Sequence, residues 1–326
     1  MSILRIAKLA GVSGATVSKV LNGKDQAISE ATRKRILEIV EREEYIPNSI
    51  AQSLKIKNTK TIGLIIPDVM NMFFGELAKG VEDSADKVGY SLILCNTDNN
   101  ETKEKKYLKV LQGKMVDGII MAAVENSSDT SLGSCKQPIV LIDRDVTTNQ
   151  TVGRIKIDNE KCIYDAVTFL IKKGCKNIGF ISSKTSNSIS QNRLNGYIKV
   201  LEENGIPYNE NIVYLDDYSV NTGSLGALSL INKSNIDGIC CGNDLIAIGA
   251  IKALREKNIN IPKDIKVIGM DDISISSYIE PPLTTIRQPI YEMGHEAVDL
   301  LIDMIEKRET NLMRILNHSL VERRST

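Results

Sequence analysis

Polar side chains that could hold a small polar ligand follow several short apolar segments of the sequence. Carboxylate, amide and guanidinium groups stand there beside two adjacent aromatic rings: Asn71, Phe73, Phe74, Asp143, Arg144, Arg193, Asn243, Asp271 and Gln288. Paired donors and acceptors next to aromatic faces suit the hydroxyls and C–H faces of a sugar. Asp and Asn at strand ends are also common turn formers and helix N-caps. The residue types alone therefore leave both interpretations open.

Catalysis and metal binding have little support in the sequence. Only His295 and His318 are available, and the pair Asp271-Asp272 has no neighbouring His or Lys motif to complete an acid–base site. The chain contains no G-x-x-x-x-G-K-[S/T], G-x-G-x-x-G, H-E-x-x-H or G-x-S-x-G motif. The six cysteines are scattered without a C-x-x-C pair and are interpreted as reduced thiols. We expect ligand binding without turnover, with no cofactor and no metal.

Nucleic-acid chemistry is suggested by where the charges lie. The 326 residues carry 41 Lys+Arg against 41 Asp+Glu. Residues 1–60 hold 11 basic and 6 acidic side chains, a net charge of +5, which leaves −5 on the rest of the chain. A basic N-terminal block on an acidic body indicates a small anion-binding module joined to a different domain.

The basic block is predicted to be helical. Apolar residues at helical spacing favour two short helices joined at Gly11, with Ser13 capping the second, and a third helix that starts after Ser29. Two helices joined by a tight turn that contains glycine form a helix-turn-helix, whose second helix enters the major groove. Its outward positions would be Gly14, Ala15, Ser18, Lys19 and Asn22. An ordinary helical bundle with a solvated charged face explains the same pattern.

The outward side chains differ in what they could read. Lys19 is the long donor among them and could reach guanine O6 and N7, while Ala15 could contact a thymine methyl group. Ser13, Thr16 and Asn22 are better suited to phosphates, which position a protein without specifying sequence.

From Thr61 onward, short apolar segments alternate with amphipathic stretches. The predicted strands cover 61–67, 90–96, 117–124, 138–144, 177–183, 212–215, 237–242, 266–271 and 284–288. The predicted helices cover 73–88, 102–113, 159–173, 193–204, 223–232, 245–257 and 290–307. This alternation indicates parallel sheets covered on both faces, arranged as two similar open α/β lobes. The last helix follows the last strand of the second lobe, so the chain is expected to cross back to the first.

An ordered series of motifs carries a family resemblance. It begins with Ile6-Ala7, Ala10-Gly11-Val12-Ser13, Thr16-Val17-Ser18, Leu21-Asn22, Tyr45-Ile46-Pro47-Asn48 and Ala51-Gln52-Ser53-Leu54. It continues through Ile62–Pro67, Asp117–Ile120, Asn243-Asp244, Gly269–Asp272 and Pro282–Ile286. The series resembles the lactose-repressor (LacI/GalR) family of bacterial transcription regulators, in register across the whole chain. Two departures are Arg5, where the family usually has an acidic residue, and Gly14, which opens the recognition helix without a side chain.

The resemblance implies an α/β protein with three parts. Residues 1–46 would form an all-α helix-turn-helix domain, and 47–60 a hinge helix and linker. Residues 61–326 would form a periplasmic-binding-protein-like core of two doubly wound α/β subdomains. The first would comprise about 61–158 plus 290–318, and the second about 159–289 plus the C-terminal tail.

The resemblance also implies how DNA is bound. A homodimer would present two recognition helices to a pseudo-palindromic double-stranded operator. In the family the hinge helix forms on operator DNA and inserts a leucine into the minor groove. Leu54 matches that leucine. Asn48, Ala51 and Lys55 would share that DNA contact. A segment this short is not stable as an isolated helix, so folding on binding is expected.

The resemblance finally implies a sugar effector. Asp158, Arg193, Asn243, Asp271 and Gln288 match positions where the family holds its sugars. A set of nine residues resembles the set that binds ribose in ribose-type repressors, so ribose or another pentose is the expected effector: Asn71, Phe73, Phe74, Asp143, Arg144, Arg193, Asn243, Asp271 and Gln288. The segment 288–294 is also similar to the catabolite-control branch, which answers to a phosphorylated carrier protein, so that alternative stays open, as does the sign of the response.

Two rival classes fit less well. An enzyme lacks its motifs, and a periplasmic sugar-binding protein would need a signal peptide and no DNA module. No stretch approaches the apolar length of a membrane span. We therefore expect a cytoplasmic repressor without a membrane segment.

Overall fold

The computed structural model describes residues 2–21, 23, 25–44, 58–124, 132, 135–144, 148–184 and 188–326. The chain divides into two compact units, residues 1–59 and 60–326, which are described separately. Each unit has its own hydrophobic core.

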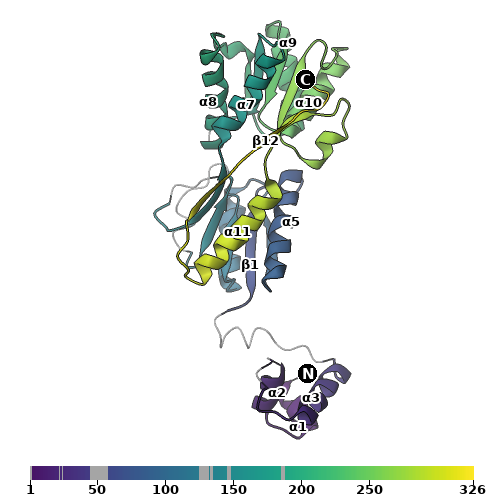
Figure 1. The fold of residues 1–326 in the computed structure, drawn as a ribbon, viewed down its shortest axis with the longest axis vertical. Helices are drawn as coiled ribbons and strands as arrows, with labels where there is room; N and C mark the ends of the chain where they lie inside the picture. The colour runs from purple at the N-terminus through teal and green to yellow at the C-terminus, as the bar shows by residue number, and fades with distance from the viewer. Residues whose placement is uncertain are drawn as a thin grey trace. The chain divides into compact units, whose positions relative to one another are not determined.

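The described residues of the smaller unit form three helices: α1 (Ile3–Ala10), α2 (Gly14–Leu21) and α3 (Glu30–Arg42) (Figure 1). Ile6, Val17 and Ile36 are fully buried between them. Gly11 ends α1 with a φ of +64°, a left-handed conformation that glycine adopts without steric cost. Ser13 and Ser29 cap the next two helices by accepting hydrogen bonds from the backbone N–H groups of Thr16 and Thr32. The predicted helix-turn-helix is confirmed.

The described residues of the larger unit form two six-stranded sheets. The strands of the first sheet lie in the order β11-β5-β4-β3-β1-β2 and are all parallel. Their bounds are β1 Thr61–Ile66, β2 Ser91–Asn96, β3 Gly118–Met121, β4 Ile139–Ile142, β5 Gly153–Ile157 and β11 Met313–Leu316. Helices α5 (Met72–Lys87) and α11 (Ile290–Ile305) pack with Ile62, Leu64 and Ile66, and α6 (Glu101–Gly113) packs with Ile65.

The second sheet has the order β12-β10-β9-β8-β6-β7, in which β12 alone is antiparallel. Its strands are β6 Ile178–Ser183, β7 Val213–Asp216, β8 Gly238–Cys241, β9 Lys266–Asp271, β10 Thr284–Arg287 and β12 Ser319–Val321. Its helices are α7 Asn159–Lys172, α8 Ser188–Glu203, α9 Val220–Lys233 and α10 Asp244–Glu256. Short 3-10 turns occur at Glu210–Ile212 and Ser274–Ser277.

Alternating side chains divide the second sheet between two helix pairs. Phe180, Cys240 and Ile268 pack with α7 and α8, whereas their chain neighbours Ile181, Cys241 and Val267 pack with α9 and α10. Successive side chains of a strand point to opposite faces, so both faces of the sheet are buried. The predicted α/β fold class with two doubly wound lobes is confirmed.

The chain crosses between the two sheets three times: after β5, after β10, and between β11 and β12. In Figure 1 α11 runs beside α5 over the first sheet, so the last helix crosses back to the first lobe as predicted. The two helix backbones approach so closely that a Cβ on Gly80 would lie 2.2 Å from the carbonyl oxygen of Tyr291. Glycine at this position allows residues 290–305 to become part of the first lobe.

Three strands and one helix start differ from the sequence prediction. β5, β11 and β12 were not predicted because they are short and carry exposed or charged residues on one face. The predicted start of a helix at Arg193 was wrong, because α8 begins at Ser188. Arg193 therefore lies inside the helix rather than at its first turn.

Candidate functional site

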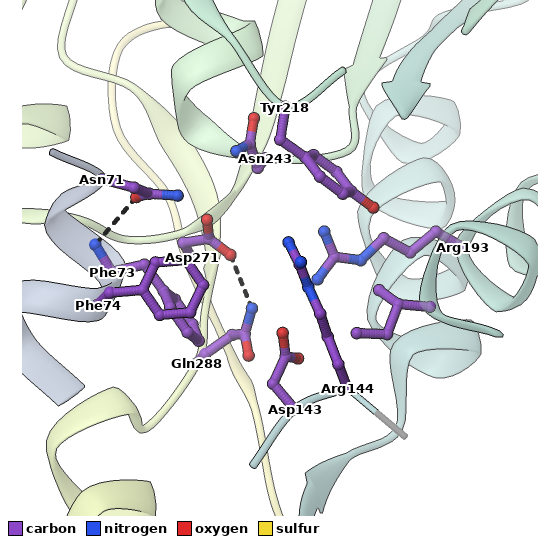
Figure 2. A pocket seen from close by; sticks show the side chains of 11 residues that line it. Asn71, Phe73, Phe74, Asp143, Arg144, Arg193, Tyr218, Asn243, Asp271 and Gln288 are labelled. Atoms are coloured by element: carbon purple, nitrogen blue, oxygen red, sulfur yellow. Dashed lines mark hydrogen bonds between the residues drawn. The ribbon is translucent and has the colours of Figure 1, made fainter. Parts of the chain in front are cut away.

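Nine of the ten predicted effector residues line one small pocket of the larger unit. Its volume is about 40 Å³, and Figure 2 shows charged, amide and aromatic groups converging on it from both lobes. The lining residues are Asn71, Phe73, Phe74, Asp143, Arg144, Ile189, Arg193, Tyr218, Asn243, Asp271 and Gln288. A pocket at the carboxyl ends of the strands of two open α/β sheets is where ligands of such sheets bind.

Strand ends and helix starts position most of these side chains. Asn71 and Asn243 are the N-caps of α5 and α10, where they accept hydrogen bonds from Phe73 N and Ile246 N. Asp143 follows β4 and Asp271 ends β9, with φ values of +62° and +125°. A non-glycine residue rarely adopts a positive φ, and such strain gathers at functional sites. Asp143 lies in the left-handed region that Asp tolerates, whereas the φ of Asp271 lies outside it and indicates backbone strain where β9 ends.

Arg193 provides the buried positive charge of the pocket. Its Nε donates to Asn159 Oδ1 at 2.8 Å and one Nη donates to the carbonyl oxygen of Gly242 at 2.6 Å. Its guanidinium also lies over the ring of Tyr218, 5.4 Å from the centroid. Burial lowers the pKa of Arg193, but Tyr218, Asp271 and Asp143 outweigh it and raise the pKa overall, so the group remains a fixed cation.

Asp271 and Gln288 form the opposite wall. The Gln288 amide donates to Asp271 Oδ1 at 2.7 Å, the bond drawn in Figure 2. Burial raises the pKa of Asp271 well above its usual range, while the positive charge of Arg193 acts in the opposite direction. Gln288 is 2% exposed, and among the described residues no donor reaches its Oε1. A buried acceptor without a donor costs free energy, so a ligand hydroxyl here would stabilise the site.

Asp244 supports this wall from behind. Its carboxylate is fully buried and accepts hydrogen bonds from Ile273 N, Ser276 Oγ and Thr285 Oγ1 at 3.0, 2.6 and 2.6 Å. Burial raises the pKa of Asp244 to about 6, against the lowering effect of those hydroxyl donors. The carboxylate ties the start of α10 to the segments that carry Asp271 and Gln288.

Asp158 lies outside the pocket. It is the N-cap of α7, where its carboxylate accepts a hydrogen bond from Lys161 N at 2.9 Å, and it borders a separate groove between α7 and α8. Its prediction as an effector residue is therefore corrected. Tyr218 and Ile189 line the pocket and were not predicted, because Ile189 has no polar group and Tyr218 lies in the loop after β7 rather than at the strand end itself.

The predicted DNA-reading residues fall partly within the described chain. Ser13, Ala15 and Lys19 are exposed, and Gly14, Thr16 and Ser18 are half-buried. The Thr16 hydroxyl lies 2.9 Å from Ser13 Oγ, so these two side chains already contact each other at the start of α2. Asn22, Asn48, Ala51, Leu54 and Lys55 lie outside the described residues.

A helix-turn-helix unit joined to a two-lobed core with a polar interlobe pocket defines a class of ligand-responsive DNA-binding regulators. Comparison with known families gives the same class. Residues 2–48 match the family described as bacterial regulatory proteins, lacI family, and residues 167–326 match the periplasmic binding protein-like domain. The chain belongs to the LacI family of transcriptional regulators, whose members are DNA-binding regulators and not enzymes.

Similar proteins cover the whole chain. The HTH-type transcriptional regulator RegA of Clostridium saccharobutylicum is 39% identical over 100% of this chain and 99% of its own length. Catabolite control protein A of Priestia megaterium is 36% identical over 100% and 99%. The lac repressor dimer bound to operator and the anti-inducer ONPF has a TM-score of 0.89 and 26% identity over 100% and 98%.

One solved relative holds a sugar. A LacI family regulator from Enterococcus faecium with bound ribose has a TM-score of 0.75 and 30% identity, over 82% of this chain and 98% of that one. Members of the family bind operator DNA and sugar effectors as dimers. Within the described ranges, no helix is long and apolar enough to cross a membrane, and no cluster of His, Cys, Asp or Glu could hold a metal ion.

Proposed function

We propose that the chain is a homodimeric repressor that leaves a pseudo-palindromic operator when a sugar fills the interlobe pocket, with ribose or another pentose as the effector. The observation that carries the proposal is the convergence of nine predicted side chains, from both lobes, on one cavity. The ribose bound to the Enterococcus faecium relative supports a pentose. Asp143, Asp271 and Gln288 would accept from sugar hydroxyls, and the two phenylalanines, packed edge to face 5.0 Å apart, would cover a C–H face.

The strand order supports a division of the core into two subdomains. Residues 61–158 with 290–318 would move as one subdomain and 159–289 with the C-terminal tail as the other, because α11 and β11 join the first sheet and β12 the second. A sugar that bridges the lobes would change their relative positions and disfavour paired hinge helices at 47–60. A coupling of about 1–3 kcal/mol between two sites is typical of such linkage.

The DNA contacts are part of the proposal. Lys19 would read a base edge and Ala15 a thymine methyl group, because both are exposed on α2. Ser13, Thr16, Ser18 and Asn22 would contact phosphates, and Gly14 would let the backbone approach the duplex. Asn48, Ala51, Leu54 and Lys55 would form the hinge contact in the minor groove, where an apolar wedge can unstack a base step.

The test combines a sugar screen with a pocket variant. Thermal-shift measurements on the full chain with pentoses and hexoses identify the effector, and fluorescence anisotropy with operator DNA measures release. Asp271→Asn should weaken the sugar at least tenfold and leave operator affinity unchanged, because it lines the pocket and not the DNA surface. Asp158→Asn is the matched control, since an amide can still cap α7. It should alter neither the sugar affinity nor the operator affinity.

Two outcomes would contradict the proposal. An equal loss of sugar and operator binding in Asp271→Asn would show that the residue acts through overall folding. If no sugar releases the chain from the operator but a phosphorylated carrier protein does, the result would instead support the second candidate, a catabolite-control regulator. The 36% identity to catabolite control protein A is the observation that favours this candidate.

A further inference from the structure

The interlobe pocket borders a larger outer cavity of about 500 Å³. The two cavities share Asn71, Phe74, Arg144 and Tyr218 as common walls. The outer cavity adds three carboxylates, from Asp68, Glu101 and Asp217. A ligand that enters the inner pocket from this side must pass them, and any substituent too large for the inner pocket must lie among them.

We infer that this cleft selects an uncharged sugar and excludes the phosphate ester of the same sugar. The inference rests on the proposed function, which places a sugar in the inner pocket, and it adds the charge class of that sugar. It depends on two observations: both inner arginines already donate to acceptors of the protein, and the N-termini of four helices around the cleft are capped by the protein's own side chains.

The arginines are the obvious phosphate ligands, yet each already donates hydrogen bonds to two acceptors of the protein. Arg193 donates to Asn159 and to the Gly242 carbonyl oxygen. Arg144 donates through one Nη to Asn99 Oδ1 at 3.1 Å and to the Ala123 carbonyl oxygen at 3.3 Å. The carboxyl groups of Asp143 and Asp271 line the same pocket as the two guanidinium groups. No lysine lines either cavity in the part of the chain that the structure describes.

Helix N-termini are the other usual phosphate sites, because their free N–H groups and dipole favour an anion. Of the helices that begin at the two cavities, α5, α6, α9 and α10 are capped by their own chain. Asn71, Asn100, Ser219 and Asn243 accept from the first-turn N–H groups of α5, α6, α9 and α10. Two of these helices also carry carboxylates in the first turn: α6 has Glu101 and Glu104, and α10 has Asp244.

Asp217 occupies the position that a phosphate would take at α9. Its carboxylate accepts a short hydrogen bond from Thr222 Oγ1, beside the Ser219 cap. Partial burial raises the pKa of Asp217, but hydrogen bonds from Ser219 and Thr222 outweigh it and lower the pKa overall. The carboxylate therefore stays ionised at neutral pH. Two lysines nearby are already paired, Lys105 with Glu101 and Lys184 with Asp216.

The test compares each sugar with its phosphate on the full chain by titration calorimetry. The pairs are ribose with ribose 5-phosphate, xylulose with xylulose 5-phosphate, and glucose with glucose 6-phosphate. In the pair that binds, we expect the dissociation constant of the phosphate to be at least a hundredfold higher than that of the neutral sugar, and this ratio is the quantity measured. Replacing both Asp68 and Asp217 by Asn should lower this ratio roughly tenfold at low ionic strength, because two like charges no longer face the phosphate.

The matched control removes two carboxylates elsewhere. Glu202→Gln with Glu256→Gln gives the same change in net charge. Both residues are exposed near the far ends of helices that begin beside the pocket, and Glu256 ends a helix of 13 residues, about 20 Å long at 1.5 Å per residue. The control should leave the ratio unchanged, which separates the local field of the cleft from the total charge of the protein.

The outcomes distinguish this inference from the proposed function. If glucose binds and the pentoses do not, the pentose effector is wrong, but a weak glucose 6-phosphate would still support charge selection. A phosphate ester that binds as tightly as its neutral sugar overturns the inference while the pocket assignment stands. A ratio that is the same in the Asn double variant as in the wild type also overturns it, and so does the absence of binding by every neutral sugar.

Discussion

The DNA-reading surface and the effector pocket are built on opposite principles. The residues proposed to read DNA within the described chain come from one continuous stretch, 13–19, and half of them are exposed. The pocket instead draws its lining from separate segments of two sheets, and Arg193, Asn243, Asp271 and Gln288 are each at least 95% buried. A surface made by one helix depends on local structure, whereas a pocket made by distant segments depends on the packing of both lobes.

The largest expected contrast comes from cavities in the two cores. Ile36→Ala should abolish operator binding but leave sugar binding intact, because Ile36 is fully buried in a small core, with seven buried apolar side chains among the residues that the structure describes. A cavity of this kind costs about 2–4 kcal/mol, much of the stability of so small a unit. Operator anisotropy and sugar calorimetry on one preparation measure both effects. Ile268→Ala, equally buried in the larger core, is the matched variant, and there sugar binding should suffer more than operator binding.

The next effect concerns the buttress of the pocket. Asp244→Ala leaves Ile273 N, Ser276 Oγ and Thr285 Oγ1 without their shared acceptor. Each unsatisfied buried donor costs about 1–3 kcal/mol before relaxation. Sugar affinity should fall roughly tenfold because Asp271 and Gln288 lose their support, and operator affinity should not change. Ser276→Ala removes one donor and should cost less. Equal losses from both variants would refute the buttress role.

A smaller effect is expected on the DNA side. Lys19→Ala should relax base preference at one position of each operator half-site, at a cost of about 1–3 kcal/mol for that base pair. Anisotropy with a panel of single-base operator variants measures it. Lys34→Ala, which removes an exposed lysine of α3, serves as the control. A uniform loss across all operator sequences would make Lys19 a phosphate contact instead.

The smallest effect is a pH dependence confined to the core. Burial raises the pKa of Asp271, so the folded chain keeps that proton at a pH where the unfolded chain has lost it. The resulting stability is present below the unfolded pKa and is lost as the pH rises through the raised folded pKa, with a slope of at most about 1.4 kcal/mol per pH unit. Urea midpoints between pH 5 and 8 should therefore fall less steeply in Asp271→Asn than in the wild type.

Tyrosine fluorescence reports on the core, since nine of the ten tyrosines lie in residues 60–326. Asp264→Asn is the control, because hydrogen bonds from Asn260 lower the pKa of Asp264 and its titration lies below this pH window. A slope that is the same in the wild type and Asp271→Asn would show that Asp271 titrates normally.

The same contrast explains what the sequence could predict. Ser29, Gly11 and the strands with buried residues on both faces carry local signals, and those elements appear within a few residues of their predicted bounds. β5, β11 and β12 are edge or half-exposed strands whose pairing is decided by the sheet they join. Position 193 was placed at a helix start because Ser188, Gln191 and Asn192 are polar and resemble a loop. Tyr218 enters the pocket only because the loop after β7 faces the other lobe.

The return of α11 and β11 to the first sheet has a consequence for how the chain folds during synthesis. The first lobe lacks these elements until residues 290–316 emerge, after the whole of the second lobe. At roughly 5–20 residues per second, the 133 residues from Ile157 to Ile290 delay completion by on the order of 10 s. During that interval the apolar side chains that α11 will cover, among them Ile62 and Leu64, remain exposed and can be bound by chaperones. The nascent first lobe should therefore be the part of this regulator most prone to aggregation.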